Sequence, residues 1–254
     1  METVSTLFLF QKVHYPMAKK KQKHIKSPAL GSSALVLKNI KPMTKTQAEF
    51  FANYDTCKSQ VLMGSSGTGK TFLSLYKALQ EVRNPDSEYN RIVIVRSAVP
   101  TRDMGFMPGD ADEKSSYYEA PYRSICNELF RRGDAYEILR KHRDIEFITT
   151  SFIRGITLDR TIIIVDEFSS LNGHELESIV TRAGKFTKIL LCGDFVQTDL
   201  TKFSEKEGSK RFIQVVQNMP DDFSINRFSE QDIVRSGLTR AFLIQRMRQF
   251  PDGI

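Results

Sequence analysis

Gly64-Ser65-Ser66-Gly67-Thr68-Gly69-Lys70-Thr71 has the spacing G-x-x-x-x-G-K-[ST], and structural signals flank it on both sides. Residues 60–63 before it predict a short apolar strand, and apolar positions at helical spacing run through residues 70–82 after it. Glycines in such a turn let successive backbone N–H groups converge on a phosphate at the helix N-terminus. This strand-loop-helix order predicts a phosphate-binding loop rather than an ordinary glycine-serine turn.

The residue types in this loop suggest separate tasks. We expect Lys70 to reach the outer phosphates of a nucleoside triphosphate and the Thr71 hydroxyl to bind Mg²⁺. The backbone of the other loop residues would surround the phosphates, and these residues are Gly64, Ser65, Ser66, Gly67, Thr68 and Gly69. The sequence therefore predicts a nucleoside triphosphate and Mg²⁺ as ligands.

Two adjacent acids, Asp166 and Glu167, follow the apolar run of residues 161–165. Five apolar or β-branched residues in a row predict a buried parallel strand, and open α/β sheets bind ligands at the carboxyl ends of their strands. We expect Asp166 to hold the metal and Glu167 to act as general base on the attacking water. The alternative, a strand end with two solvated acids, is less favoured once a phosphate-binding loop precedes it.

A third apolar strand, residues 188–192, leads to Asp194 and Gln197. The Gln197 amide could hydrogen-bond the terminal phosphate or the attacking water and so sense hydrolysis. A Gly-Asp turn followed by a surface glutamine explains this segment equally well.

Further segments carry a family resemblance. In chain order they are Ile94-Val95-Arg96-Ser97-Ala98-Val99-Pro100, Gly105-Phe106-Met107-Pro108-Gly109-Asp110, Arg154-Gly155-Ile156-Thr157-Leu158, Asp166-Glu167, Thr181-Arg182 and Gly193-Asp194-Phe195-Val196-Gln197-Thr198-Asp199-Leu200. From about residue 40 to residue 234 the sequence resembles the PhoH-like proteins. The resemblance implies a single ATP-hydrolysing core of the superfamily 1 helicase kind. Its fold would be an α/β P-loop NTPase (RecA-like) three-layer sandwich with a mainly parallel central sheet.

The resemblance also implies roles for residues outside the two acids and the loop. In such cores a glutamine upstream of the loop contacts adenine, and Gln47 matches that position; Thr44 and Gln47 also form a capping-box pattern, and both roles are compatible. Arg182 and Arg235 match recurrent positions from which an arginine could act on the phosphates across a ring interface. An ion pair within the same chain is the alternative for each arginine.

One departure from the family pattern concerns the segment after the two acids. The family form continues with alanine, glutamine and asparagine, whereas Phe168, Ser169 and Ser170 follow here. The amide that would couple the nucleotide to a bound ligand is therefore missing.

Positive charge is concentrated near the start of the chain. The 254 residues carry a formal net charge of +7, and residues 1–45, with nine lysines and one glutamate, carry +8. The lysine-rich residues 19–26 and the Ser-, Pro- and Gly-containing stretch after them predict a disordered basic arm over residues 1–40. Residues 41–254 would form one PhoH-like P-loop ATPase domain, too short for a second motor lobe. Residues 1–16 match nothing in the family, so Met17 is an alternative start.

A single motor lobe and a basic arm suggest partners. A homo-oligomeric ring, such as a hexamer, would let a neighbour complete the site. RNA or DNA could bind the arm without sequence preference, and helicase-like cores face nucleic acid at the end of the second strand. The residues available there are Arg96, Ser97, Thr101, Arg102, Tyr117 and Tyr118. A solubilising tail, ion pairs and side-chain packing explain the same features.

Cysteine, histidine and hydropathy patterns exclude several classes of protein. Three scattered cysteines and four histidines without ligand spacing indicate neither a disulfide framework nor a second metal site. No apolar run is long enough to span a bilayer, and residues 1–16 lack the pattern of a secretion signal. We therefore expect a cytoplasmic protein without a membrane partner.

Periodicity and capping patterns predict the remaining elements. We expect a long polar loop over residues 101–118, helices over residues 121–131, 135–142 and 172–182, and a strand over residues 146–149. An edge strand over residues 223–228 and a C-terminal helix opened by Ser229 would follow. The helix would carry an apolar stripe made of Ile233, Val234, Leu238, Phe242, Leu243 and Met247.

Three functional hypotheses are compatible with these features. The paired acids favour a hydrolase that uses water as acceptor and couples ATP hydrolysis to rearrangement of an oligomer on RNA or DNA. A nucleotide-gated assembly module with little intrinsic turnover is the alternative from another class. A phosphotransferase is the third, and it would form ADP only when an acceptor is supplied.

Overall fold

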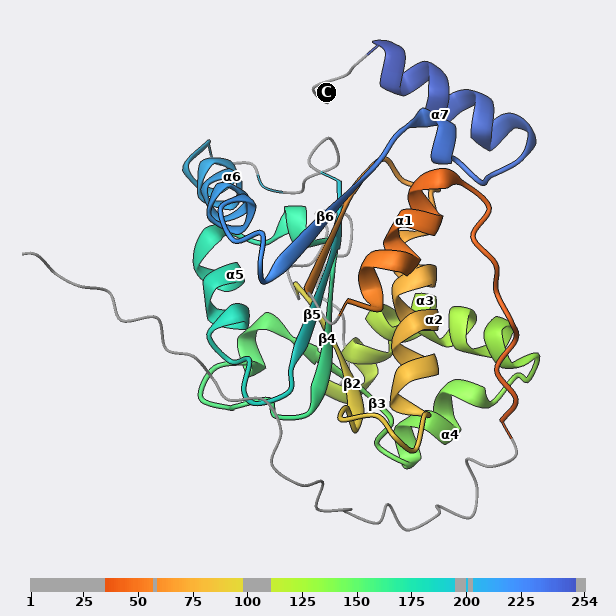
Figure 1. The fold of residues 1–254 in the computed structure, drawn as a ribbon, viewed down its shortest axis with the longest axis vertical. Coiled ribbons are helices and arrows are strands. Elements are labelled where there is room, and N and C mark those ends of the chain that lie inside the picture. Colours follow the sequence, from red (N-terminus) through yellow and green to blue (C-terminus); the bar gives the residue numbers. More distant parts are fainter. Residues whose placement is uncertain (1–34, 57–58, 98–110, 195–199, 201–202, 250–254) are drawn as a thin grey trace, which may run out of the picture.

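An all-parallel, six-stranded sheet forms the centre of the described part of the protein, with the strand order β3-β2-β4-β5-β1-β6 (Figure 1). The structure, a computed structural model, describes residues 35–56, 59–97, 111–194, 200 and 203–249. The strands are β1 (Ser59–Gly64), β2 (Arg91–Arg96), β3 (Ile145–Thr149), β4 (Thr161–Asp166), β5 (Lys188–Gly193) and β6 (Phe223–Phe228). The predicted mainly parallel central sheet is confirmed, and β6 is the predicted edge strand.

Helices cover both faces of this sheet, which gives the predicted three layers (Figure 1). On one face lie α1 (Lys45–Tyr54), α2 (Lys70–Val82), α3 (Ala111–Phe130) and α4 (Ala135–Lys141), and on the other lie α5 (Gly173–Val180) and α6 (Phe203–Gln217). Three short 3₁₀ helices, η2 (Thr150–Phe152), η3 (Phe168–Ser170) and η4 (Glu230–Asp232), and the C-terminal α7 (Gly237–Gln249) complete the described elements. None of these described helices is long and apolar enough to cross a membrane.

Strand β4 shows how the apolar run produces two cores. Side chains alternate across a strand, so Ile162 and Ile164 pack in the cluster beneath α1 to α4. Ile163 and Val165 pack in the cluster beneath α5 and α6. A strand that is buried on both faces needs apolar residues at every position, which is why residues 161–165 contain no alternation of polar and apolar residues.

The sheet order places the phosphate-binding loop near the two acids. Because all strands run in one direction, the carboxyl ends of β1, β5 and β4 lie along the same sheet edge. Strand β5 lies between the other two, and Cys192 pairs with Leu62 of β1 on one side and Asp166 of β4 on the other. The loop after β1 and the acids after β4 are therefore two strand spacings apart.

Helix α3 corrects two sequence-based predictions. It begins at Ala111 and contains Pro121 in its interior, whereas we predicted a loop through residue 118 and a helix start at Pro121. Proline lacks a backbone N–H and disfavours an interior helical position. That cost is offset because the turns after it bury Tyr122, Cys126 and Leu129 completely. Tertiary packing has overridden the local signal for a helix start.

The C-terminal region corrects a third prediction. The Ser229–Asp232 capping box is present, but it opens only the 3₁₀ turn η4, after which Ile233 is extended. Helix α7 starts later, at Gly237, whose φ of +57° suits a glycine. Of the predicted apolar stripe, Leu243 is buried while Leu238 and Phe242 are 85% and 64% exposed. The stripe therefore does not form one buried helix face.

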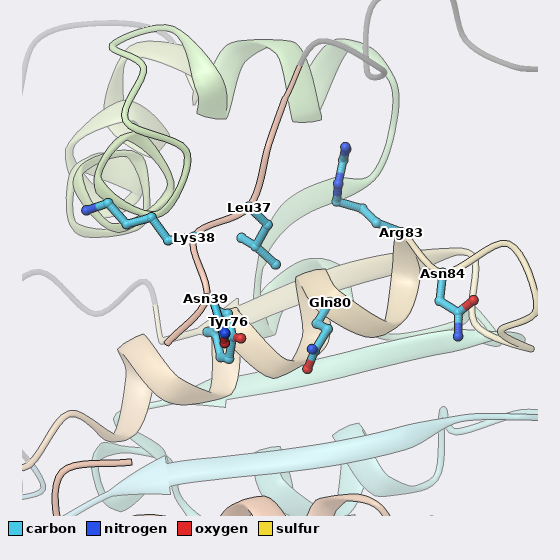
Figure 2. Close-up of a pocket in the computed structure, with 7 residues that line it drawn as sticks. All are labelled: Leu37, Lys38, Asn39, Tyr76, Gln80, Arg83 and Asn84. Carbon is cyan, nitrogen blue, oxygen red and sulfur yellow. The ribbon is translucent and has the colours of Figure 1, made fainter. Parts of the chain in front are cut away.

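Residues 35–40, which we assigned to the basic arm, pack against the core. Leu35 is buried, its carbonyl accepts a hydrogen bond from Arg83, and the Lys38 amide donates to the Leu129 carbonyl. A cavity of about 430 Å³ lies between this segment and the later turns of α2 (Figure 2). Its lining residues are Leu37, Lys38, Asn39, Tyr76, Gln80, Arg83 and Asn84. None of the described residues that line this cavity is an acid that could hold a metal.

Candidate nucleotide site

The phosphate-binding loop has a backbone that only glycines adopt without strain. Gly64, Gly67 and Gly69 have φ values of +139°, +80° and +85°. A Cβ atom at Gly64 would lie 2.1 Å from the Phe228 carbonyl oxygen, so the loop leaves β1 in close contact with β6. Helix α2 begins directly after the loop, and its N-terminal amides and helix dipole favour an anion there.

The Lys70 side chain, at the start of α2, reaches back into the preceding loop. Its ammonium donates to the carbonyl oxygens of Gly64 and Ser65 at 2.7 and 2.8 Å. Burial lowers the pKa of Lys70, and the acids around it, among them Asp194 and Glu167, oppose this effect. The lysine thus has a protein acceptor set at the base of the loop that phosphate oxygens could replace.

Thr71 and Asp166 meet at the mouth of the loop. The Thr71 hydroxyl, in the first turn of α2, donates to Asp166 Oδ1 at 2.7 Å, although the two residues are 95 positions apart in the sequence. Mg²⁺ prefers hard oxygen ligands, and neighbouring oxygens of its octahedral shell are about 2.9 Å apart. The residue types and the spacing therefore fit a magnesium ion shared with phosphate oxygens, with Thr71 and Asp166 as its protein ligands.

Glu167 occupies a special backbone position directly after β4. Its φ of +53° is left-handed, which turns the chain sharply into η3. The side chain is accessible to solvent, yet it lines the cavity described below. Removal from bulk water, together with the adjacent Asp166 carboxylate, raises the pKa of Glu167. A carboxylate exposed to a confined volume of water is suited to accept a proton from a water molecule.

Tyr122 is a site residue that sequence reasoning missed. Its hydroxyl donates to Asp166 Oδ2 at 2.9 Å, and the side chain is completely buried. The residue belongs to α3, which we predicted as an ordinary helix, and no motif distinguishes it. The only available signal was that a tyrosine buried against the sheet needs a partner for its hydroxyl.

A cavity of about 570 Å³ connects these groups. The side chains that line it include Lys70, Thr71, Asp166, Glu167 and Asp194. Residues from the start of the described chain and from the C-terminal region also line it, and these are Ile40, Lys41, Met43, Gln47, Val234 and Arg235. The cavity therefore combines groups that could bind a metal and phosphates with side chains that could surround a base.

The Gln47 side chain, which lines the cavity, is hydrogen-bonded to the phosphate-binding loop. Its amide nitrogen donates to the Thr68 carbonyl at 3.1 Å, and its amide oxygen accepts from the Met43 backbone at 2.8 Å. The helix N-cap is Thr44, as predicted, and its hydroxyl accepts from the Gln47 backbone. The Gln47 amide oxygen accepts from the backbone of Met43 rather than from that of Thr44, so the predicted capping box is incomplete. The amide nitrogen instead ties the start of α1 to the phosphate-binding loop.

The predicted arginines lie in different places. Arg235 lines the cavity of its own chain, and its Cγ would lie 3.0 Å from a Cβ atom at Gly67. Arg182 follows α5, and its carbonyl accepts from the Leu158 amide, three residues before β4 begins. It therefore lies at the sheet edge opposite the phosphate-binding loop. None of the ion pairs found among the described residues involves either arginine.

Several predicted residues lie outside the described part of the chain. They are Gln197, Thr101, Arg102 and the lysine-rich residues 19–26. Tyr117 is 64% exposed on α3, whereas Tyr118 is half-buried. Residues 168–170, where the family has alanine, glutamine and asparagine, form η3. Phe168 is buried there, and the Ser169 hydroxyl accepts a hydrogen bond from the Asp194 amide.

Comparisons with known proteins give consistent matches. Residues 39–245 match the family model described as PhoH-like protein. A PhoH-like protein of Bacillus subtilis is 30% identical over 79% of this chain and 62% of its own length, and one of Synechocystis is 31% identical over 70% and 53%. The large terminase of a thermophilic bacteriophage superposes with a TM-score of 0.48 at 11% identity, over 82% of this chain and 50% of that one. The chain thus spans little more than half the length of these relatives.

Proposed function

Since this chain belongs to the PhoH-like protein family, we propose that it binds ATP with Mg²⁺ in the cavity between the phosphate-binding loop and β4 and hydrolyses it. The loop residues Gly64 to Thr71 would hold the phosphates. Thr71 and Asp166 would hold the metal, which would offset negative charge on the phosphates. Gln47 and Arg235, which also line the cavity, would lie beside the base.

The contact between Thr71 and Asp166 carries this proposal. A phosphate-binding loop and a pair of acids can occur in one sequence without meeting in the fold. Here the two oxygens are 2.7 Å apart, and both line the same cavity as Lys70 and Glu167. The proposed phosphate, metal and water sites would therefore share one place at the carboxyl edge of the sheet.

The proposed reaction uses water as the acceptor. Glu167 takes a proton from a water molecule while the oxygen of that water attacks the terminal phosphorus of ATP. The bond between this phosphorus and the bridging oxygen breaks, and the products are ADP and inorganic phosphate. Lys70 exchanges the Gly64 and Ser65 carbonyls for phosphate oxygens. Gln197, whose side chain lies outside the described residues, is proposed to sense the terminal phosphate.

The opposite positions of Arg182 and Arg235 bear on assembly. Arg235 lines the cavity of its own chain, whereas Arg182 does not line it and lies at the opposite sheet edge, from which it could serve the site of a neighbouring copy. We propose a homo-oligomeric ring in which Arg182 acts across the interface. RNA or DNA is proposed to bind where β2 ends, beside Arg96 and Ser97.

Phosphate release from ATP, measured with and without added polynucleotide, tests this function. Lys70→Ala should abolish tight ATP binding, and Glu167→Gln should bind ATP yet release phosphate about 10²-fold more slowly. Glu177→Gln is the matched control, because Glu177 is an exposed acid on α5 that lies 4.0 Å from the His174 side chain and does not line the cavity. Hydrolysis by the Lys70 variant would show that the site is misplaced. A wild-type protein that binds ATP without turnover would favour the assembly module.

A further inference from the structure

The two oxygens of the Asp166 carboxylate have different protein partners. Oδ1 accepts from the Thr71 hydroxyl at 2.7 Å, and Oδ2 accepts from the Tyr122 hydroxyl at 2.9 Å. A carboxylate that is held at both oxygens cannot rotate freely about its Cβ–Cγ bond. Tyr122 thus fixes the oxygen that faces away from Thr71, and it does so from a different helix.

Tyr122 also contacts Arg96, the last residue of β2. The Arg96 guanidinium lies close enough to the same phenol to interact with it electrostatically. Guanidinium has donors only and the phenol gives its own hydrogen to Asp166, so the phenol oxygen is the atom that could accept from Arg96. The 2.9 Å contact to a carboxylate oxygen, which accepts hydrogen bonds, makes the Tyr122 hydroxyl the donor of this pair.

The strand register explains why these three residues meet. Strand β2 pairs with β4, and Val95 lies opposite Val165, so the next residues along the two strands are Arg96 and Asp166. Both are at the carboxyl edge of the sheet, and α3, which covers one face of the sheet, brings the buried Tyr122 hydroxyl to this edge. The three side chains therefore form a row from the end of β2 to the proposed metal ligand.

We propose that Tyr122 is a positioning residue that orients the Asp166 carboxylate for Mg²⁺ and that it links this carboxylate to Arg96 as one hydrogen-bonded unit. This inference rests on the proposed ATP and Mg²⁺ site. It gives the end of β2 a route to the metal site that does not need the amide missing after Glu167. Loss of either member should therefore change the affinity for the metal rather than for the nucleotide itself.

A second buried tyrosine in the same fold provides the matched control. Tyr136 of α4 donates to the buried Glu119 carboxylate at 2.9 Å, and Tyr136 is also completely buried. This pair has the same chemistry as Tyr122 and Asp166, but it does not line the cavity. Tyr136→Phe removes an equivalent hydrogen bond and reports what general destabilisation alone would do.

The test is the binding of a fluorescent ATP analogue, measured first in EDTA and then during titration with Mg²⁺. Tyr122→Phe should raise the Mg²⁺ concentration for half-maximal tight binding ~10-fold, because a hydrogen bond to a charged group is lost. Its metal-free affinity should remain within about twofold of wild type. Tyr136→Phe should leave both quantities within about twofold.

Arg96 variants test the second half of the proposal. Arg96→Ala should raise the Mg²⁺ concentration for half-maximal tight binding ~3-fold. Arg96→Lys, which keeps a donor, should bring this concentration most of the way back to the wild-type value. The double variant with Tyr122→Phe should be no worse than Tyr122→Phe alone, since the two residues act in one chain. If circular dichroism shows that Tyr122→Phe is unfolded, the comparison of Arg96→Ala with Arg96→Lys serves as the test.

Three outcomes would overturn the inference. They are an unchanged Mg²⁺ requirement in Tyr122→Phe, an equal shift in Tyr136→Phe, and additive effects of the Tyr122 and Arg96 changes. A wild-type protein whose nucleotide binding ignores Mg²⁺ would instead refute the proposed function itself. The wild-type titration therefore separates failure of the function from failure of the inference.

Discussion

The Val234 amide donates a hydrogen bond to the carbonyl of Gly67, at the tip of the phosphate-binding loop, over 3.1 Å. This contact fastens the segment after β6 to a loop that lies 167 positions earlier in the chain. Arg235 and Leu243 pack against the same glycine. The C-terminal region therefore forms part of the lining of the proposed nucleotide site, and changes in it should affect nucleotide binding.

The glycine at the tip of the loop offers the first prediction. Gly67→Ala should lower the free energy of unfolding by ~2 kcal/mol and weaken ATP binding, because its φ is +80° and a Cβ atom would lie 2.9 Å from Leu243 Cδ1. Thermal unfolding and a nucleotide titration measure the two effects.

Two other glycines separate strain from crowding. Gly155 has a φ of +83° with no atom within 4 Å of an added Cβ, and Gly133 has neither a φ in the left-handed region nor an atom within 4 Å. Gly155→Ala should cost ~1 kcal/mol without changing ATP affinity, and Gly133→Ala should be near neutral. Equal ATP affinities in the Gly67 and Gly155 variants would contradict the proposed packing at the loop.

A pH-dependent prediction concerns Asp232, which is 3% exposed and connects η4 to α1. Burial alone would raise its pKa, but hydrogen bonds from the Ser229 backbone and from hydroxyls, including that of Thr46, lower it below its usual value. Because the folded-state pKa is depressed, this contribution is fully present above the unfolded-state pKa of about 3.9 and disappears as the pH falls through the folded-state value.

Asp232→Asn should therefore destabilise the protein by ~1–2 kcal/mol at pH 7, and the difference from wild type should shrink as the pH falls below about 4. Urea denaturation at several pH values measures this. Asp134→Asn is the comparison, since Asp134 also has a lowered pKa but forms an exposed pair with Arg132. A difference for Asp232→Asn that stays constant down to pH 3 would show that the carboxylate is not the stabilising group.

Mixing experiments distinguish the two arginines. Arg182→Ala and Lys70→Ala should each lose ATPase activity, and a mixture of the two should recover a part of it, because one copy supplies the loop and its neighbour supplies the arginine. Arg235→Ala mixed with Lys70→Ala should recover nothing, since both changes disable the same site. Recovery with Arg235 rather than Arg182 would reverse the assignment.

Local patterns were sufficient to predict the three strands of the site. The loop between residues 60–63 and α2, and the acids after residues 161–165, are signals contained within a few residues, and the sheet edge brings them together as predicted. The fold class follows from the same signals, because buried parallel strands and intervening helices have only a few ways to pack.

The remainder depends on contacts between distant segments. Pro121 indicated a helix start, but burial of the turns after it stabilises a helix through it, and this places Tyr122 against Asp166. The Ser229–Asp232 capping box forms its predicted hydrogen bonds, but it opens only one 3₁₀ turn. Neither the position of Arg235 beside Gly67 nor that of Arg182 at the opposite edge has a signature in the local sequence.

The most direct test of the central claim is a crystal structure with a non-hydrolysable ATP analogue and Mn²⁺, a substitute for Mg²⁺ whose anomalous scattering locates the metal. We predict a Mn²⁺ peak at about 2.0–2.3 Å from Thr71 Oγ1, beside Asp166, with the terminal phosphates against Lys70. A metal bound elsewhere, or an analogue that leaves the cavity between Gln47 and Asp166 empty, would contradict the account.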